Sequence, residues 1–176
     1  MRRTLALSLV LTLSLGLLSG CGPDTQAQEL TAQPVSVQPA GSPAVDQALT
    51  SFGLSLLQSA REAESGPVLL SPLSAALALS MAANGADGDT LAQFETVLGG
   101  GVTLDELNAA CAQLLSDYGD LDGSTECLIA NSLWTDPEGM IREDFIGKCQ
   151  GIFDAQVFSQ DLSAPSVVPA VNGWVS

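Results

Sequence analysis

Residues 66–90 read GPVLLSPLSAALALSMAANGADGDT, and this stretch decides the fold. Ser71 can cap a helix by accepting hydrogen bonds from its free N–H groups, and Pro72 fits the first helical position, where no backbone donor is needed. No charged residue occurs from Leu73 to Ala83, so no face of this helix suits water. The pattern therefore predicts a wholly buried helix at the centre of a sizeable domain. Two glycines, Gly85 and Gly88, are expected to end it.

The composition is that of one globular domain with an acidic surface. Of the 176 residues, 46% are hydrophobic and only 14% are charged. Acidic residues outnumber basic ones 20 to 5, and loss of Arg2 and Arg3 with a leader would leave 20 against 3, a net charge of −17. Nucleic acid and anionic lipid head groups need Lys and Arg to neutralise phosphate, so no nucleic-acid partner is expected.

The N-terminus has the layout of an export signal. Arg2 and Arg3 precede an apolar run from Leu5 to Leu18, which is fourteen residues long and so shorter than the about 20 that a membrane-spanning helix needs. The following Leu-Ser-Gly-Cys, residues 18–21, resembles the lipobox of bacterial lipoproteins. That resemblance implies removal of residues 1–20, acylation of Cys21, and anchoring of the exported protein to the outer face of a bacterial membrane. The alternative is ordinary secretion, with Cys21 a chance residue.

Residues 21–43 are expected to form a flexible tether between the lipid anchor and the folded part. From Gly22 to Pro43 the chain shows no helical or strand period and no aromatic residue, and it is rich in Gln, Pro, Ala, Ser and Thr. A flexible coil of this length would hold the domain about 25–30 Å from the anchor. The domain itself is expected to occupy residues 44–176.

Four further segments carry apolar residues at helical spacing, and each is predicted to be an amphipathic helix. Thr103 and Glu106 form the pattern of a capping box at the start of the third of these. The inward residues are Val45, Leu49, Phe52, Leu56 and Ala60; Leu91, Phe94 and Leu98; Leu107, Cys111, Leu114 and Tyr118; and Ile141, Phe145, Cys149 and Ile152.

Three short segments are predicted to be strands. Val68–Leu70 is a short apolar run before the buried helix, and Ala155–Ser159 also has strand character. Cys127–Leu133 reads CLIANSL, which is nearly continuous in small and apolar residues, so this strand is expected to be covered on both faces inside a sheet. A last helical segment opens near Pro165, and Pro169 should kink or delay it.

Four sequence blocks, in order and spacing, resemble the N-terminal portion of a serpin, less than half of one. They are SPLS at 71–74, ANSLW at 130–134, FDAQV at 153–157 with Asp161 and Leu162, and VNGWV at 171–175. The resemblance covers about residues 44–176 and implies an α+β, serpin-like fold. In that fold, N-terminal helices pack on part of a large, mostly antiparallel sheet. Serpins continue past the last block, so the resemblance implies a domain that is incomplete at its C-terminus and lacks the reactive-centre loop.

Histidine and the common catalytic motifs are missing from this sequence. It has no histidine, so Ser–His and Cys–His catalysis and imidazole–zinc sites are excluded within it, and no P-loop, GxSxG or CxxC motif occurs. We expect no enzyme activity, metal or cofactor. Cys111, Cys127 and Cys149 fall on apolar faces and are interpreted as buried free thiols, although one disulfide is possible in an exported protein.

Ser71, Ser74 and Asn131 are the candidate site residues. The residues alone explain the serines as a helix cap and a first-turn hydroxyl, and they explain Asn131 as a polar residue that needs a partner in an apolar strand. The serpin resemblance adds that the two serines lie beneath the large sheet, where its strands part to admit the cleaved loop. Their implied role is to hold or release the sheet.

The resemblance implies that the parent protein inhibits a serine-type or cysteine endopeptidase. In that family an exposed loop is offered as substrate, the protease acylates on it, and the loop then inserts as a new strand into the large sheet. The present chain would not inhibit by itself, because it would lack the loop. The alternative is a non-inhibitory binding or structural lipoprotein built on the same fold, and nothing in residues 1–176 discriminates between the two.

Overall fold

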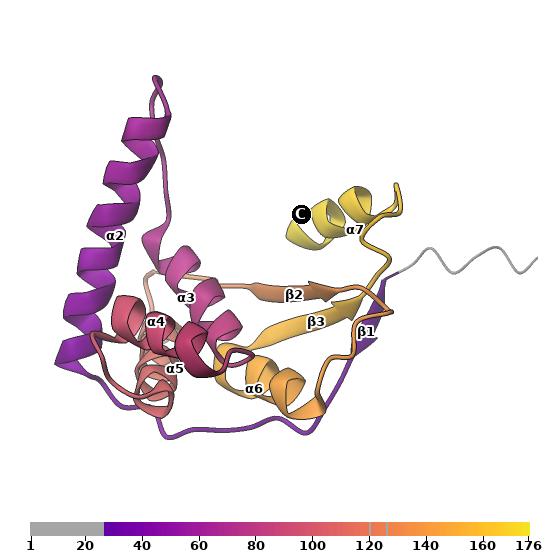
Figure 1. Cartoon of the computed structure of the whole chain (residues 1–176), viewed down its shortest axis with the longest axis horizontal. Helices are drawn as coiled ribbons and strands as arrows, with labels where there is room; N and C mark the ends of the chain where they lie inside the picture. Colours follow the sequence, from indigo (N-terminus) through magenta and orange to yellow (C-terminus); the bar gives the residue numbers. More distant parts are fainter. Residues whose placement is uncertain (1–26, 120, 126) are drawn as a thin grey trace, which may run out of the picture.

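The computed structural model describes residues 27–119, 121–125 and 127–176, which contain six helices and three strands (Figure 1). This mixture confirms the predicted α+β class. Cys21 and the export signal lie outside the described residues. The elements are β1 (Gln28–Leu30), α2 (Pro43–Ala63), α3 (Pro72–Ala83), α4 (Gly88–Gly99), α5 (Leu104–Gly119), β2 (Asn131–Thr135), α6 (Glu143–Phe153), β3 (Ala155–Ser159) and α7 (Val167–Val175).

The described strands form one three-stranded mixed sheet in the order β1-β3-β2. The central strand β3 pairs antiparallel with β1 and parallel with β2. It occupies Ala155–Ser159, as the sequence predicts. Its alternate residues Ala155 and Val157 are buried, and α6 lies on one side of the sheet with α7 on the other (Figure 1). The chain passes from α6 into β3 through Asp154, whose φ of 49° makes the reversal.

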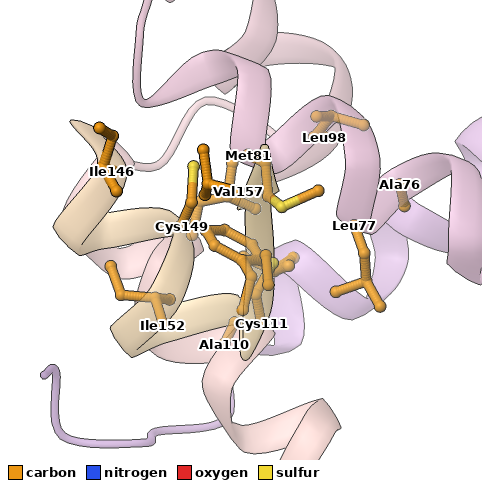
Figure 2. Close-up of a cluster of buried hydrophobic side chains, with 14 residues drawn as sticks. Ala76, Leu77, Met81, Leu98, Ala110, Cys111, Ile146, Cys149, Ile152 and Val157 are labelled. Atoms are coloured by element: carbon orange, nitrogen blue, oxygen red, sulfur yellow. The ribbon is translucent and has the colours of Figure 1, made fainter. Parts of the chain in front are cut away.

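The core lies between the sheet and the helices α3, α5 and α6, with α2 and α4 packed outside them (Figures 1 and 2). The apolar stripes predicted for α2, α4, α5 and α6 supply six of the fourteen buried residues of this described core. Phe153 and Val157 are fully buried beside the thiols of Cys111 and Cys149. The remaining buried members are Val45, Ala76, Leu77, Met81, Leu98, Leu107, Ala110, Ile146, Ile152 and Ala155.

The helix α3 begins as predicted but is buried on only one side. Ser71 is its N-cap and Pro72 its first residue. Leu77 and Met81 are buried, but Ser74 is exposed and Leu79 keeps 37% of its surface accessible. The prediction of a wholly buried helix was therefore wrong, because apolar composition alone does not say which side of a helix has a neighbour in the described residues.

Only one of the two hydrogen bonds of the predicted capping box forms at the start of α5. The Thr103 hydroxyl accepts a hydrogen bond from the backbone N–H of Glu106 at 3.3 Å. The Glu106 carboxylate does not return that bond; instead it accepts from the hydroxyl of Ser42 at 2.8 Å and so ties α5 to the start of α2. At the other end of α5, Tyr118 is exposed, contrary to its predicted inward position, because the last turn extends past the core.

Two strand predictions are corrected. Val68–Leu70 is extended but belongs to no strand, and Leu69 is 97% exposed. The strand predicted at Cys127–Leu133 is β2, shifted to Asn131–Thr135, and it lies at an edge of the described sheet rather than inside it. Leu128 is 84% exposed. Small and apolar residues do not fix the register, which is set here by the pairing of Asn131 with Ala155.

The predicted tether is folded over most of its length. Gln28–Leu30 is strand β1, and the chain from Thr31 to Ser42 crosses below α6 and α5 before it enters α2 (Figure 1). We call residues 28–40 the N-terminal strap. The prediction of a free coil failed because the strap is held mainly through its backbone, and backbone contacts leave no periodic pattern in the sequence.

The helix α7 starts at Val167, two residues before Pro169. A proline in the first turn of a helix costs no intrahelical hydrogen bond, because the first N–H groups have no partner there. Pro169 thus delays the helix from Pro165 to Val167, as expected. None of the nine residues of α7 is buried.

Candidate functional site

Ser71 and Ser74 form one hydroxyl pair at the N-terminus of α3. The Ser71 hydroxyl oxygen accepts from the backbone N–H of Ser74 at 3.3 Å, and the two hydroxyl oxygens are 2.8 Å apart. Both residues are exposed. With no histidine in the chain and no base hydrogen-bonded to either hydroxyl in the described residues, the pair caps a helix and presents no activated nucleophile.

Asn131 joins the start of β2 to the turn between α6 and β3. Its side-chain amide donates to the backbone carbonyl oxygen of Phe153 at 2.8 Å. Phe153 is the last residue of α6, where a carbonyl has no partner inside the helix. Asn131 therefore satisfies a helix end and fixes the register of β2 against β3. No hydrogen bond in the described residues links Asn131 to Ser71 or Ser74, so the candidate residues form two separate groups.

The sheet face under α7 carries aromatic and amide side chains that were not predicted as site residues, although Trp134, Gln156 and Trp174 lie in the quoted sequence blocks. Trp134 of β2 stacks on Phe158 of β3, with ring centroids 4.5 Å apart. Trp174 of α7 donates from its indole nitrogen to the side-chain oxygen of Gln156 on β3 at 2.5 Å. The Trp174 contact attaches α7 to the sheet by one polar link and little buried area. In a strand, successive side chains point to opposite faces of the sheet. The sequence could therefore have predicted that Gln156 and Phe158 lie on the face opposite the buried Ala155 and Val157.

Gln160, the residue that follows β3, makes two further hydrogen bonds. Its backbone N–H donates to the carbonyl oxygen of Thr135 at 2.8 Å, and the side-chain amide of Gln160 donates to the Ser166 hydroxyl at 3.2 Å. Gln160 is buried. This residue thus extends the pairing of β2 and β3 by one step and attaches the turn that leads into α7.

A second polar cluster joins α3 to α5. The side-chain amides of Asn84 and Asn108 exchange two hydrogen bonds, of 2.8 and 2.9 Å, and Asn84 also donates to the carbonyl oxygen of Ser80. Asn108 is 2% exposed. Because each buried amide is paired, the cluster fixes how the two helices pack rather than offering a binding group.

All three described cysteines are free, and two of them are buried as expected. Burial raises the pKa of the Cys111 thiol, partly offset by the Ser80 hydroxyl, and raises the pKa of the Cys149 thiol to about 11. The nucleophilic form of cysteine is the thiolate, so neither buried thiol is poised for catalysis near neutral pH. Cys127 is only half-buried, because it precedes β2 instead of lying in it.

The described residues offer no cluster of three or more His, Cys, Asp or Glu side chains that could hold a metal ion. Within the same residues, every helix is too short or too polar to cross a membrane.

Comparison with known proteins places this arrangement in one family. The family profile described as "Serpin (serine protease inhibitor)" matches residues 47–176. Over 113 residues the chain is 29% identical to the plasma serine protease inhibitor of Bos taurus, covering 62% of this chain and 28% of that protein. Over 136 residues it is 29% identical to Serpin-Z7 of Hordeum vulgare, covering 72% and 34% respectively.

A solved structure agrees with these sequence matches. The native state of the thermophilic serpin tengpin superposes with a TM-score of 0.70 and 30% identity, over 85% of this chain and 39% of tengpin. The chain spans about a third of the length of the curated relatives it matches. Its α+β architecture is accordingly part of the serpin fold, and the chain belongs to the serpin family.

Proposed function

We propose that this chain is the N-terminal part of a surface-anchored serpin that inhibits a serine-type or cysteine endopeptidase. The match of residues 47–176 to a family described as serine protease inhibitors carries the proposal. The parent protein would offer an exposed loop as substrate, become acylated onto the protease, and insert the loop as a strand into its large sheet. In this account the chain supplies buried helices and part of the sheet, not a catalytic group.

The free edge of β2 supports this proposal. In the described residues β2 pairs only with β3, so the backbone groups on its other edge are unpaired. An unpaired edge of an apolar strand is a template for a further strand. The remaining strands of a serpin sheet could add there, which would make β2 the internal strand that its composition suggests.

Exposed apolar side chains support it as well. Leu69 is 97% exposed, Leu128 is 84% exposed, and Leu54 of α2 is 67% exposed. Leu54 and Leu69 line one shared groove between α2 and the extended segment Val68–Leu70. In the proposed parent, the rest of the serpin domain covers these residues. Residues 22–176 alone would not inhibit, because they would lack the reactive-centre loop.

We also propose that Cys21 carries the lipid anchor on the outer face of a bacterial membrane. Because β1 begins at Gln28, only residues 22–27 would connect the anchor to the fold. Six extended residues span at most about 20 Å, so the domain would stay closer to the membrane than a 22-residue tether allows. The net charge of −17 expected after loss of Arg2 and Arg3 would keep the domain surface away from anionic head groups.

The test is a titration with the complete product of the gene that encodes this chain. A panel of serine and cysteine endopeptidases is incubated with increasing inhibitor, and residual activity is measured after dilution. Inhibition that persists after dilution is expected for at least one protease, and residues 22–176 serve as the matched control that inhibits none. Full recovery of every protease would contradict the inhibitor proposal and favour a non-inhibitory serpin.

A further inference from the structure

The N-terminal strap, residues 28–40, is held at one edge of the sheet as a short strand. Gln28, Glu29 and Leu30 pair antiparallel with Ser159, Phe158 and Val157 of β3. The strap residues are exposed or half-buried, and the side chains of Leu30, Ala32 and Val37 pack against the core. The strap therefore contributes few side-chain contacts compared with the helices, and its backbone carries much of its attachment.

Gln150 of α6 continues the hydrogen bonding of the strap past the end of β1. Its side-chain oxygen accepts from the N–H of Ala32 at 3.0 Å, and its side-chain nitrogen donates to the carbonyl oxygen of Leu30 at 2.9 Å. These are the two groups that a neighbouring strand would engage. The glutamine side chain thus binds the main chain of the strap with one donor and one acceptor, as an added strand does in β-augmentation.

Two glycines of α6, Gly147 and Gly151, let its backbone contact the next part of the strap directly. The N–H of Val35 donates to the carbonyl oxygen of Gly147 at 2.9 Å. A Cβ atom at Gly151 would lie 2.6 Å from the nitrogen of Val35, and one at Gly147 would overlap the carbonyl oxygen of Gln33. Any side chain at these two positions would push the strap away. The glycines, one helical turn apart, let an extended chain lie directly on the helix.

We propose that β3, Gln150 and the Gly147–Gly151 face of α6 form a peptide-binding site, which in this chain is filled by its own strap. Its ligand class is an extended peptide with small or branched apolar side chains at the positions of Leu30, Ala32 and Val37. The site selects for free backbone N–H groups at positions 32 and 35. A covalently attached strap competes at an effective concentration in the millimolar range, so added peptide enters the site only at millimolar concentration or when the strap is weakened.

The test weakens the strap without touching the site. In the complete gene product, the double change Ala32→Pro and Val35→Pro removes the two N–H groups that bond to Gln150 and Gly147. A fluorescent peptide with the sequence of residues 27–41, AQELTAQPVSVQPAG, is then titrated against this variant and against the unmodified chain. We expect at least about tenfold tighter binding to the double variant, because its own strap competes less.

Two matched controls distinguish binding at this site from non-specific binding of the peptide. A peptide that carries the same two prolines should not bind, because it lacks the donors that the site engages. Adding Gly151→Ala to the double variant should abolish binding of the unmodified peptide, since the new Cβ occupies the place of the Val35 backbone. Equal binding of both peptides, or no binding to a double variant with an unchanged circular dichroism spectrum, overturns the proposal.

If the double variant does not fold, amide hydrogen exchange on the unmodified chain replaces the titration. Peptide at millimolar concentration should displace the attached strap, so the amides of Ala32 and Val35 lose protection, whereas the proline peptide leaves them unchanged. Unchanged protection with both peptides overturns the proposal.

Discussion

Truncation of Leu77, compared with two other leucines, tests the position of the core on α3. Leu77 is 1% exposed, whereas Leu79 on the same helix is 37% exposed and Leu69 just before it is 97% exposed. Changing leucine to alanine removes about three methylene equivalents, worth about 2.4 kcal/mol when fully buried. A cavity left in a packed core raises this loss, so Leu77→Ala should destabilise by about 3–4 kcal/mol.

The same arithmetic gives smaller losses for the two controls. Leu79→Ala should cost about 1–1.5 kcal/mol, because part of its side chain is already in water and solvent fills the space it leaves. Leu69→Ala should change the free energy of unfolding by less than about 0.5 kcal/mol. The series therefore predicts a graded loss that follows the exposure of each leucine and not its position in an apolar sequence run.

Amide hydrogen exchange with mass spectrometry is the suitable assay. It reports a local opening free energy for the peptides that cover α3 and α6, so it does not require one sharp unfolding transition. Leu77→Ala should accelerate exchange in both helices, since they share one core. Equal losses for Leu77→Ala and Leu79→Ala would refute the one-sided burial of α3, and a loss under about 0.5 kcal/mol at Leu77 would refute its central place.

Four further outcomes are expected. Cys21→Ser should move the protein from the membrane fraction to the soluble one or block its processing; normal processing and retention in the membrane would refute the anchor. Burial raises the pKa of Cys149 from 9.0 to about 11, so the folded state favours the neutral thiol. The stability that this preference contributes is present below pH 9 and is lost as the pH rises toward 11. The urea midpoint should therefore fall over this range, and by less in Cys149→Ala. Asn131→Ala should cost about 1 kcal/mol in urea unfolding by removing the bond to the Phe153 carbonyl; a change within error would make that bond dispensable. Residues 22–176 alone should unfold broadly and bind a dye for exposed apolar surface, whereas a sharp transition from a monomer would mean a complete domain.

Local signals in the sequence were sufficient for much of the fold. Ser71 and Pro72 mark the start of α3 because capping depends on neighbouring residues only. The strand Ala155–Ser159 and the apolar stripes of α2 and α6 follow from periodicity. These features need no information about distant parts of the chain.

The errors concern features that distant neighbours decide. Leu79 and Leu69 are as apolar as Leu77, but their exposure depends on which elements lie beside them. The strap was missed because Gln150 and Gly151 hold its backbone, so the strap residues themselves carry almost no pattern. The signal was on α6 instead, where two glycines four residues apart flank a glutamine.

Intact mass spectrometry under denaturing conditions tests the inhibitor account most directly. The complete gene product is mixed with a serine protease that it inhibits, and the mixture is denatured before measurement. The account predicts one species with the mass of the protease plus the inhibitor, less the peptide released from the C-terminal side of the cleaved loop, because the protease serine remains esterified to the new carboxyl end. Recovery of only free protease with intact or cleaved gene product would contradict it.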